Sequence, residues 1–79
     1  MAMAKSSANE GNMARIGSLR KRELEVLGWL SEGKSNWEIG QIIECTTETV
    51  KKHVHRILGT LEVSNRTSAA LIYLESRRG

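Results

Sequence analysis

Residues 46–58 read Thr46-Thr47-Glu48-Thr49-Val50-Lys51-Lys52-His53-Val54-His55-Arg56-Ile57-Leu58, and this stretch decides the fold. At about 100° of rotation per residue, a helix through it collects its apolar residues on one narrow side, namely Val50, Val54, Ile57, Leu58 and, further on, Leu61. The opposite side collects the polar residues Glu48, Lys52, His55 and Arg56. We therefore predict an amphipathic helix over residues 47–61, with one face for a core and the other for a polyanion.

A second, shorter amphipathic segment lies just upstream, from Asn36 to Ile43. Ser35 precedes it as a predicted N-cap, and we expect its apolar side to bury Ile39, Ile42 and Ile43. Only Glu44, Cys45 and Thr46 separate it from the next helix, where Thr46 is the predicted N-cap. Two helices joined by so short a turn, the second with a basic outer face, are typical of a helix-turn-helix DNA reader. Gly40 lowers helix propensity, so we expect it to allow close approach of the following helix.

Two further helices complete the predicted domain. The first runs from about Arg20 to Glu32 and ends at Gly33 in a left-handed cap. The last starts near Ser64 or Asn65. The predicted fold class is therefore all-α, a compact four-helix helix-turn-helix domain over residues 18–79. Residues 1–17 have no usable periodicity and are predicted to be a disordered tail or linker.

Composition narrows the function. The 79 residues allow one domain with a net charge of +3. Residues 47–61 carry Lys51, Lys52 and Arg56 against Glu48, a charge of 3 − 1 = +2, and this uneven distribution favours a nucleic-acid partner. The chain has no aspartate, no glycine-rich phosphate loop and no metal-ligand spacing, which argues against an enzyme, a cofactor or a metal. The lone Cys45 fits a reducing compartment, and no segment suits a membrane span or signal peptide. We expect a cytoplasmic protein.

Many residues spaced along the chain match, in order, the pattern of a known family. The sequence resembles the LuxR-type (GerE- or FixJ-type) DNA-binding domain of bacterial transcription regulators. The resemblance covers Leu19 to Ala69 and rests on Leu19, Arg22-Glu23, Glu25-Val26-Leu27, Gly33, Asn36, Glu38-Ile39, Ile43, Thr49-Val50-Lys51, His53, Ile57, Leu61, Val63, Asn65-Arg66-Thr67 and Ala69. The sequence departs from the family at Arg20, where Thr or Ser is usual, so the reciprocal cap with Glu23 is not expected and Ser18 is a candidate helix start.

The resemblance implies roles for individual residues. It implies that the helix over residues 47–61 enters the major groove of double-stranded DNA, with base-edge contacts from Lys51, Lys52 and His55. It implies phosphate contacts from Ser35, Asn36, Thr47, Thr49, Arg56, Asn65 and Arg66. It also implies a homodimer on promoter or operator DNA through the last helix, for which we select Leu71 and Leu74, with RNA polymerase as a candidate partner and no small-molecule ligand in this domain.

Several residues have a second interpretation. His53 fits a partly buried structural histidine as well as a phosphate contact. Trp37 fits either an interface or a cover for the edge of the core. Leu71 and Leu74 could complete the core instead of a dimer surface. The alternative function is a helical protein-protein interaction module that has kept the helix-turn-helix scaffold.

Overall fold

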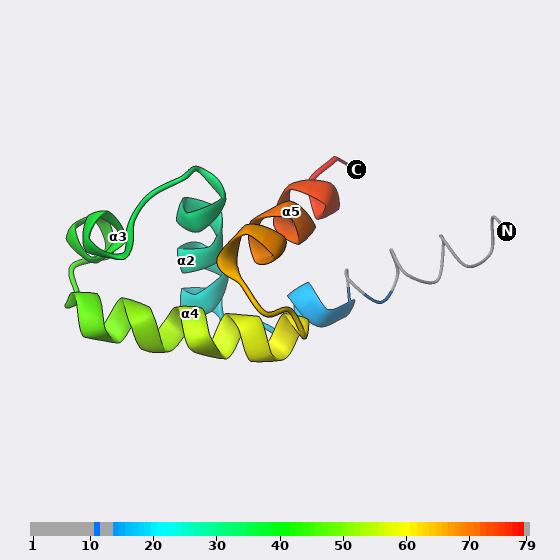
Figure 1. Ribbon diagram of the computed structural model, residues 1–79, viewed down its shortest axis with the longest axis horizontal. Coiled ribbons are helices and arrows are strands. Elements are labelled where there is room, and N and C mark those ends of the chain that lie inside the picture. The colour runs from blue at the N-terminus through cyan, green and yellow to red at the C-terminus, as the bar shows by residue number, and fades with distance from the viewer. Residues whose placement is uncertain (1–10, 12–13, 79) are drawn as a thin grey trace, which may run out of the picture.

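The computed structural model describes residue 11 and residues 14–78, and every regular element in these residues is helical. The four predicted helices are α2 (Lys21–Ser31), α3 (Asn36–Ile43), α4 (Thr47–Leu61) and α5 (Arg66–Ser76). In Figure 1, α4 lies along one edge of the molecule, and α2, α3 and α5 lie above it. The all-α helix-turn-helix prediction is confirmed.

The predicted tail over residues 1–17 lies largely outside the described residues. Among the described residues of this range, residues 14–17 are helical. Ile16 packs against the core, and the Arg15 Nη2 atom lies 3.3 Å from Glu62 Oε1 just after α4. These contacts join residues 15 and 16 to the domain, and four residues are too few to show a sequence periodicity.

Helix ends follow local signals in the sequence. Arg20 is the N-cap of α2, so the helix does not start at Ser18. The Glu23 carboxylate accepts a hydrogen bond from the Arg20 backbone N–H at 3.1 Å. A guanidinium has no acceptor, so only this half of a capping box forms. At the other end Gly33 has φ of 84°, as predicted for a left-handed cap.

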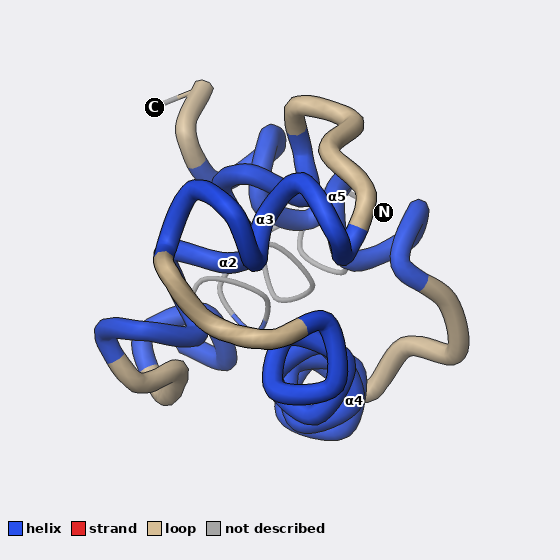
Figure 2. Tube along the Cα trace, turned by 90° about the vertical axis from the view of Figure 1, so that its left-hand side faces the viewer, coloured by secondary structure: helices blue, strands red, loops and turns tan. Residues whose placement is uncertain are grey.

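The core lies between α2, α3 and α4 and takes one residue from α5. Its buried apolar side chains are Val26, Leu27, Leu30, Ile39, Ile43, Val50, Val54, Ile57, Leu61 and Ala69. The predicted apolar stripe of α4 is therefore its buried side, with Leu58 packed at the edge. Figure 2 views α4 nearly along its axis and shows the other labelled helices on one side of it. The opposite side of α4 is exposed to solvent.

The prediction for α3 was wrong at one residue. Ile42 was expected to be buried, but it is 42% exposed. The buried residues of α3 are Ile39, Gly40 and Ile43. At about 100° per residue these three point within one sector, and Ile42 points roughly 100° away from its centre. Burial of glycine backbone has moved the inner face of the helix away from Ile42.

Gly40 is required by the turn between α3 and α4. A Cβ atom at this position would lie 2.7 Å from the Cys45 carbonyl oxygen. The prediction of close approach was correct, but the neighbour is the turn before α4 and not the helix itself. The Cys45 N–H also donates to the Gly40 carbonyl at 2.9 Å. Thr46 then caps α4 by accepting from the Thr49 N–H at 3.1 Å, so the turn is held at both ends.

Candidate nucleic-acid interface

The outer face of α4 is a continuous polar stripe. A shallow hollow runs along it, lined by Glu48, Lys51, Lys52, His55, Arg56, Gly59 and Thr60. These residues recur every three or four positions, which places them on one side of a helix. All three predicted base-reading residues, Lys51, Lys52 and His55, lie on this stripe and are exposed.

The stripe is basic. It carries three cationic side chains, Lys51, Lys52 and Arg56, and one carboxylate, that of Glu48. The Lys51 Nζ and Glu48 Oε1 atoms are 3.9 Å apart, and both side chains are 71% exposed. An ion pair this exposed contributes little free energy, so it does not prevent Lys51 from taking a base or phosphate partner. The geometry fits a helix that approaches a polyanion side-on.

Polar groups also gather at the start of α4. Thr47 and Thr49 are exposed in its first turn. The Thr49 hydroxyl lies 3.0 Å from that of Thr46, and one of the two donates to the other. The first turn of a helix has unpaired backbone N–H groups and a partial positive charge, which favour a phosphate. The predicted phosphate roles of Thr47 and Thr49 are thus compatible with their positions.

Ser35 is the confirmed N-cap of α3 in a complete capping box. Its hydroxyl accepts from the Glu38 N–H at 3.1 Å, and the Glu38 Oε1 atom accepts from the Ser35 N–H at 2.8 Å. The hydrogen bond from the Ser35 backbone, reinforced by that from its side chain, holds the pKa of the Glu38 carboxyl below its ordinary value. A pKa lowered by folding means that the cap contributes stability above the unfolded pKa and loses it as pH falls through the folded pKa.

Replacing Ser35 by alanine is expected to raise the pKa of Glu38 toward its ordinary value, because the cap that orients the carboxylate is weakened. NMR titration of the Glu38 side-chain carboxyl measures the change directly. Ser35→Thr keeps the hydroxyl and serves as the control, with no change expected in the pKa of Glu38. An unchanged Glu38 pKa in the Ser35→Ala variant would show that the Ser35 backbone N–H alone lowers it and that the side-chain hydroxyl does not contribute.

The starts of α3 and α5 are linked by an arginine. The Arg66 Nη1 atom donates to the Asn36 side-chain oxygen at 2.7 Å, and Nη2 donates to the Lys34 carbonyl at 3.0 Å. Asn65 caps α5 by accepting from the Ser68 N–H at 2.9 Å. Asn36 and Arg66 were predicted only as phosphate contacts, and the sequence did not indicate the bond between them. Asn65 was also one of the two predicted starts of the last helix. Arg66 and Asn36 keep other polar hydrogens for a phosphate.

Arg56 is paired with a buried carboxylate that the sequence analysis did not single out. Glu23 is 3% exposed. Its Oε2 atom lies 3.5 Å from the Arg56 Nε atom, whose side chain remains 60% exposed. A buried carboxylate needs a cationic or hydrogen-bonding partner. The position of Glu23 in the first turn of α2 was the only sequence signal that its carboxylate has a structural role. Arg56 is thus anchored at Nε while its outer end faces solvent.

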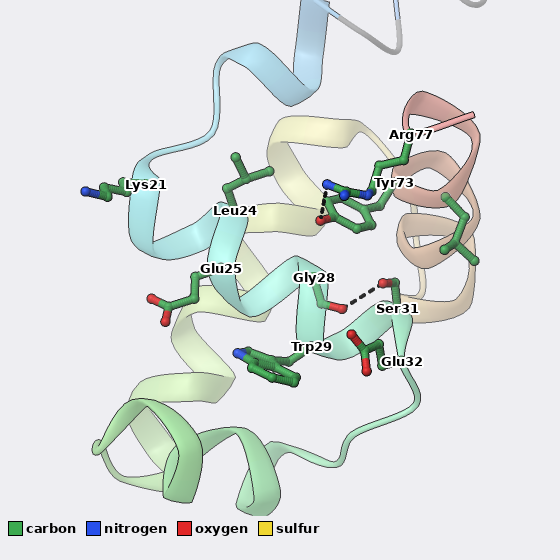
Figure 3. A pocket seen from close by; sticks show the side chains of 10 residues that line it. Lys21, Leu24, Glu25, Gly28, Trp29, Ser31, Glu32, Tyr73 and Arg77 are labelled. Atoms are coloured by element: carbon green, nitrogen blue, oxygen red, sulfur yellow. Dashed lines mark hydrogen bonds between the residues drawn. The ribbon is translucent and has the colours of Figure 1, made fainter. Parts of the chain in front are cut away.

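The outer side of α5 is apolar. Leu71 is 61% exposed and Leu74 is 47% exposed, so neither completes the core. Figure 3 shows the groove that Leu74 helps to line between α2 and α5, with Tyr73 across from Gly28 and hydrogen-bonded to Arg77. Dimerisation through Leu71 and Leu74 stays a prediction, although both are available for it.

Trp37, His53 and Cys45 differ in how far they are buried. Trp37 is 62% exposed and does not cover the core. His53 is half-buried, and Cys45 is half-buried against the core.

Within residues 14–78, no group of three or more potential ligand side chains could hold a metal ion. No helix in the described part of the chain combines the length and apolar character needed to cross a bilayer.

The geometry is that of a helix-turn-helix domain in which α4, the second helix of the motif, presents a basic stripe. Comparison with known families matches residues 17–73 to bacterial regulatory proteins of the luxR family. The chain therefore belongs to the LuxR family and carries the DNA-binding helix-turn-helix domain of transcriptional regulators. This domain is not an enzyme.

Individual relatives agree with this assignment. The chain is 54% identical over 54 residues to the transcriptional regulatory protein LiaR of Bacillus subtilis, covering 68% of this chain and 26% of LiaR. It is 37% identical over 59 residues to the nitrate/nitrite response regulator protein NarP of Escherichia coli, covering 75% and 27%. For the transcriptional activator protein BjaR1 of Bradyrhizobium diazoefficiens, the identity is 39% over 59 residues, covering 75% and 24%. The chain thus spans about a quarter of the length of these relatives.

Proposed function

We propose that this chain binds double-stranded DNA in a sequence-specific manner, with α4 in the major groove. The observation that carries the proposal is the exposed stripe of Lys51, Lys52 and His55 along α4, opposite a fully apolar inner face. A lysine ammonium in the major groove can donate to guanine O6 or N7. The imidazole of His55 offers one donor and one acceptor to base edges when neutral.

The phosphate contacts flank this stripe on α3, α4 and α5. Ser35 and Asn36 lie at the start of α3, Thr47 and Thr49 at the start of α4, and Asn65 and Arg66 at the start of α5. Hydroxyls, amides and helix N-termini suit phosphate oxygens, and such contacts set the position of a protein on the duplex. The anchored guanidinium of Arg56 adds a further contact from α4 itself.

A homodimer on DNA follows from the free face of α5. Exposed Leu71 and Leu74 would be buried against the same residues of a second copy, in a symmetric contact. Two copies of α4 would then read two half-sites about one helical turn apart. A promoter or operator would be the target in the bacterial cytoplasm, at the nucleoid, and RNA polymerase is a candidate protein partner.

The proposal is tested by selecting bound duplexes from a random pool and then measuring affinity for the enriched sequence. We expect Lys51→Ala and Lys52→Ala each to lose about 1–3 kcal/mol of binding free energy, with relaxed selectivity at the base pair that the lysine reads. Lys21→Ala is the charge-matched control, because Lys21 lines the α2–α5 groove and not the α4 stripe. Fluorescence anisotropy on matched and mismatched duplexes gives both quantities.

Two outcomes would contradict the proposal that the lysines of α4 read bases. An equal loss on every sequence would make the lysine a backbone contact. No enrichment at low salt, combined with capture of a protein through Trp37 or Leu71, would favour the protein-interaction module instead, and these exposed apolar side chains are the observation in its favour.

A further inference from the structure

A second hollow lies beside the α4 stripe, between the start of α2 and the middle of α4. It measures about 320 Å³ and is more enclosed than the stripe; its lining residues are Arg20, Arg22, Glu23, Thr49, Lys52, His53 and Arg56. Four of them carry a permanent positive charge and one carries a negative charge, so the net charge is 4 − 1 = +3 with His53 neutral. Several positive charges around one small hollow create a positive potential that attracts an anion.

The charges of this hollow are only partly compensated within the protein. Arg22 donates to the Glu25 Oε1 atom at 2.9 Å and to the Ile43 carbonyl at 2.9 Å. The Glu23 oxygens are occupied by the Arg20 N–H and by Arg56 Nε, below the surface. Among residues 14–78, no ion pair involves the Arg20 guanidinium or the Lys52 ammonium. These two cations are therefore available to a ligand.

The position of the hollow identifies the ligand. Lys52 and Arg56 line both the hollow and the outer stripe of α4, so the two are contiguous. A helix in the major groove has a phosphate backbone along each flank. The hollow would thus face one of these strands when the stripe faces the base edges. Its position fits a phosphodiester of the bound duplex.

The Arg20 side chain has no hydrogen bond or ion pair to any other side chain in residues 14–78. The residue is exposed, and its side chain makes no capping hydrogen bond to α2. The helix start is held instead by the Arg20 backbone and Glu23. A residue with an acceptor would cap better here, so the guanidinium is unfavourable for the helix yet lies at the mouth of a cationic hollow.

We infer that the hollow between α2 and α4 binds one phosphate of the DNA backbone, with Arg20 and Arg56 as its principal ligands and Lys52 at its border. This inference rests on the proposed function and extends it, because it adds α2 to the helices that touch DNA. Bidentate donation from a guanidinium suits a phosphate particularly well.

The test compares Arg20→Ala with Lys21→Ala in the full 79-residue chain on the selected duplex. Both variants lose one positive charge at the start of α2, but only Arg20 lines the hollow, whereas Lys21 lines the groove toward α5. Figure 3 shows the Lys21 side chain directed away from Tyr73 and α5, at the outer edge of that groove. We expect Arg20→Ala to weaken binding roughly threefold to tenfold on every sequence and to reduce the salt slope by about 0.9. Arg20→Lys is expected to restore part of the loss.

A scan with neutral methylphosphonates locates the contact. One substituted phosphate should weaken binding by the wild-type chain and weaken binding by Arg20→Ala clearly less, since Arg56 and Lys52 then supply the only remaining contacts to that phosphate. Equal affinities and salt slopes for the Arg20→Ala and Lys21→Ala variants would overturn the inference, as would a loss confined to one base pair. If Lys51→Ala still weakens binding in that case, the proposed function stands. If the wild-type chain binds no duplex, the proposed function fails as well.

Discussion

Replacing Ile57 by alanine is expected to lower the free energy of unfolding by about 2–5 kcal/mol. Ile57 is 0% exposed and lies on the inner face of α4, one residue after Arg56. The loss combines the transfer free energy of the removed methyl and methylene groups with the cost of the cavity they leave. A small domain has only about 5–15 kcal/mol of stability, so the variant should approach the limit of folding. Urea denaturation followed by circular dichroism measures the change.

Leu58→Ala is the matched control on the same helix. Leu58 is only half-buried at the edge of the core, so its truncation should cost clearly less. Saturating DNA should recover part of the Ile57→Ala loss, because binding to the folded state alone shifts the equilibrium toward it. If Ile57→Ala cost no more than Leu58→Ala, α4 would be rotated relative to the core, and its outer stripe would not be the DNA-facing side.

Replacing Gly40 by alanine is expected to destabilise the domain by about 1–3 kcal/mol, although alanine is the better helix former by about 1 kcal/mol. The added methyl group would lie 2.7 Å from the Cys45 carbonyl oxygen. That oxygen belongs to the backbone of the turn and cannot rotate away as a flexible side chain would. Relief therefore requires a shift of α3 relative to α4. Thermal unfolding gives the stability, and affinity for DNA reports the shift.

Gly59→Ala makes the same chemical change where the structure leaves room. A Cβ atom at Gly59 meets nothing within 4 Å, and the residue is exposed within α4. Propensity alone should then act, and the variant should gain roughly 0.5–1 kcal/mol. Opposite signs for the two glycines are the expected result. A gain at Gly40 as well would mean that the turn is looser than the structure shows.

The elements predicted from the sequence were those with a local signal. Ser35 and Thr46 were predicted as N-caps because their side chains can accept from a backbone N–H within the next turn, and both do. The last helix was expected to start near Ser64 or Asn65, and Asn65 is its N-cap. The apolar inner face of α4 was predicted by periodicity alone, because a helix that packs on a core must have one apolar face. Periodicity also placed Lys52, His55 and Arg56 on the outer side of α4, whereas the base-edge role of Lys51 came from the family resemblance.

The features that sequence reasoning missed depend on residues far apart in the chain. The bond between Arg66 and Asn36 joins positions 30 residues apart, and no periodicity reports such a pairing. The burial of Glu23 was not predicted, because it becomes favourable only when Arg56 of another helix supplies a partner for the carboxylate. Ile42 was misassigned because the inner face of α3 is set by the turn at Gly40, not by its most apolar side.

The three residues between α3 and α4 have a consequence for association. Cys45 is tied back to Gly40, and Thr46 is tied forward to Thr49, so the angle between the two helices is set before any partner arrives. The conformational entropy of that arrangement is lost once, during folding, and is not subtracted again from the affinity. The helix pair can then dock as a preorganised rigid body.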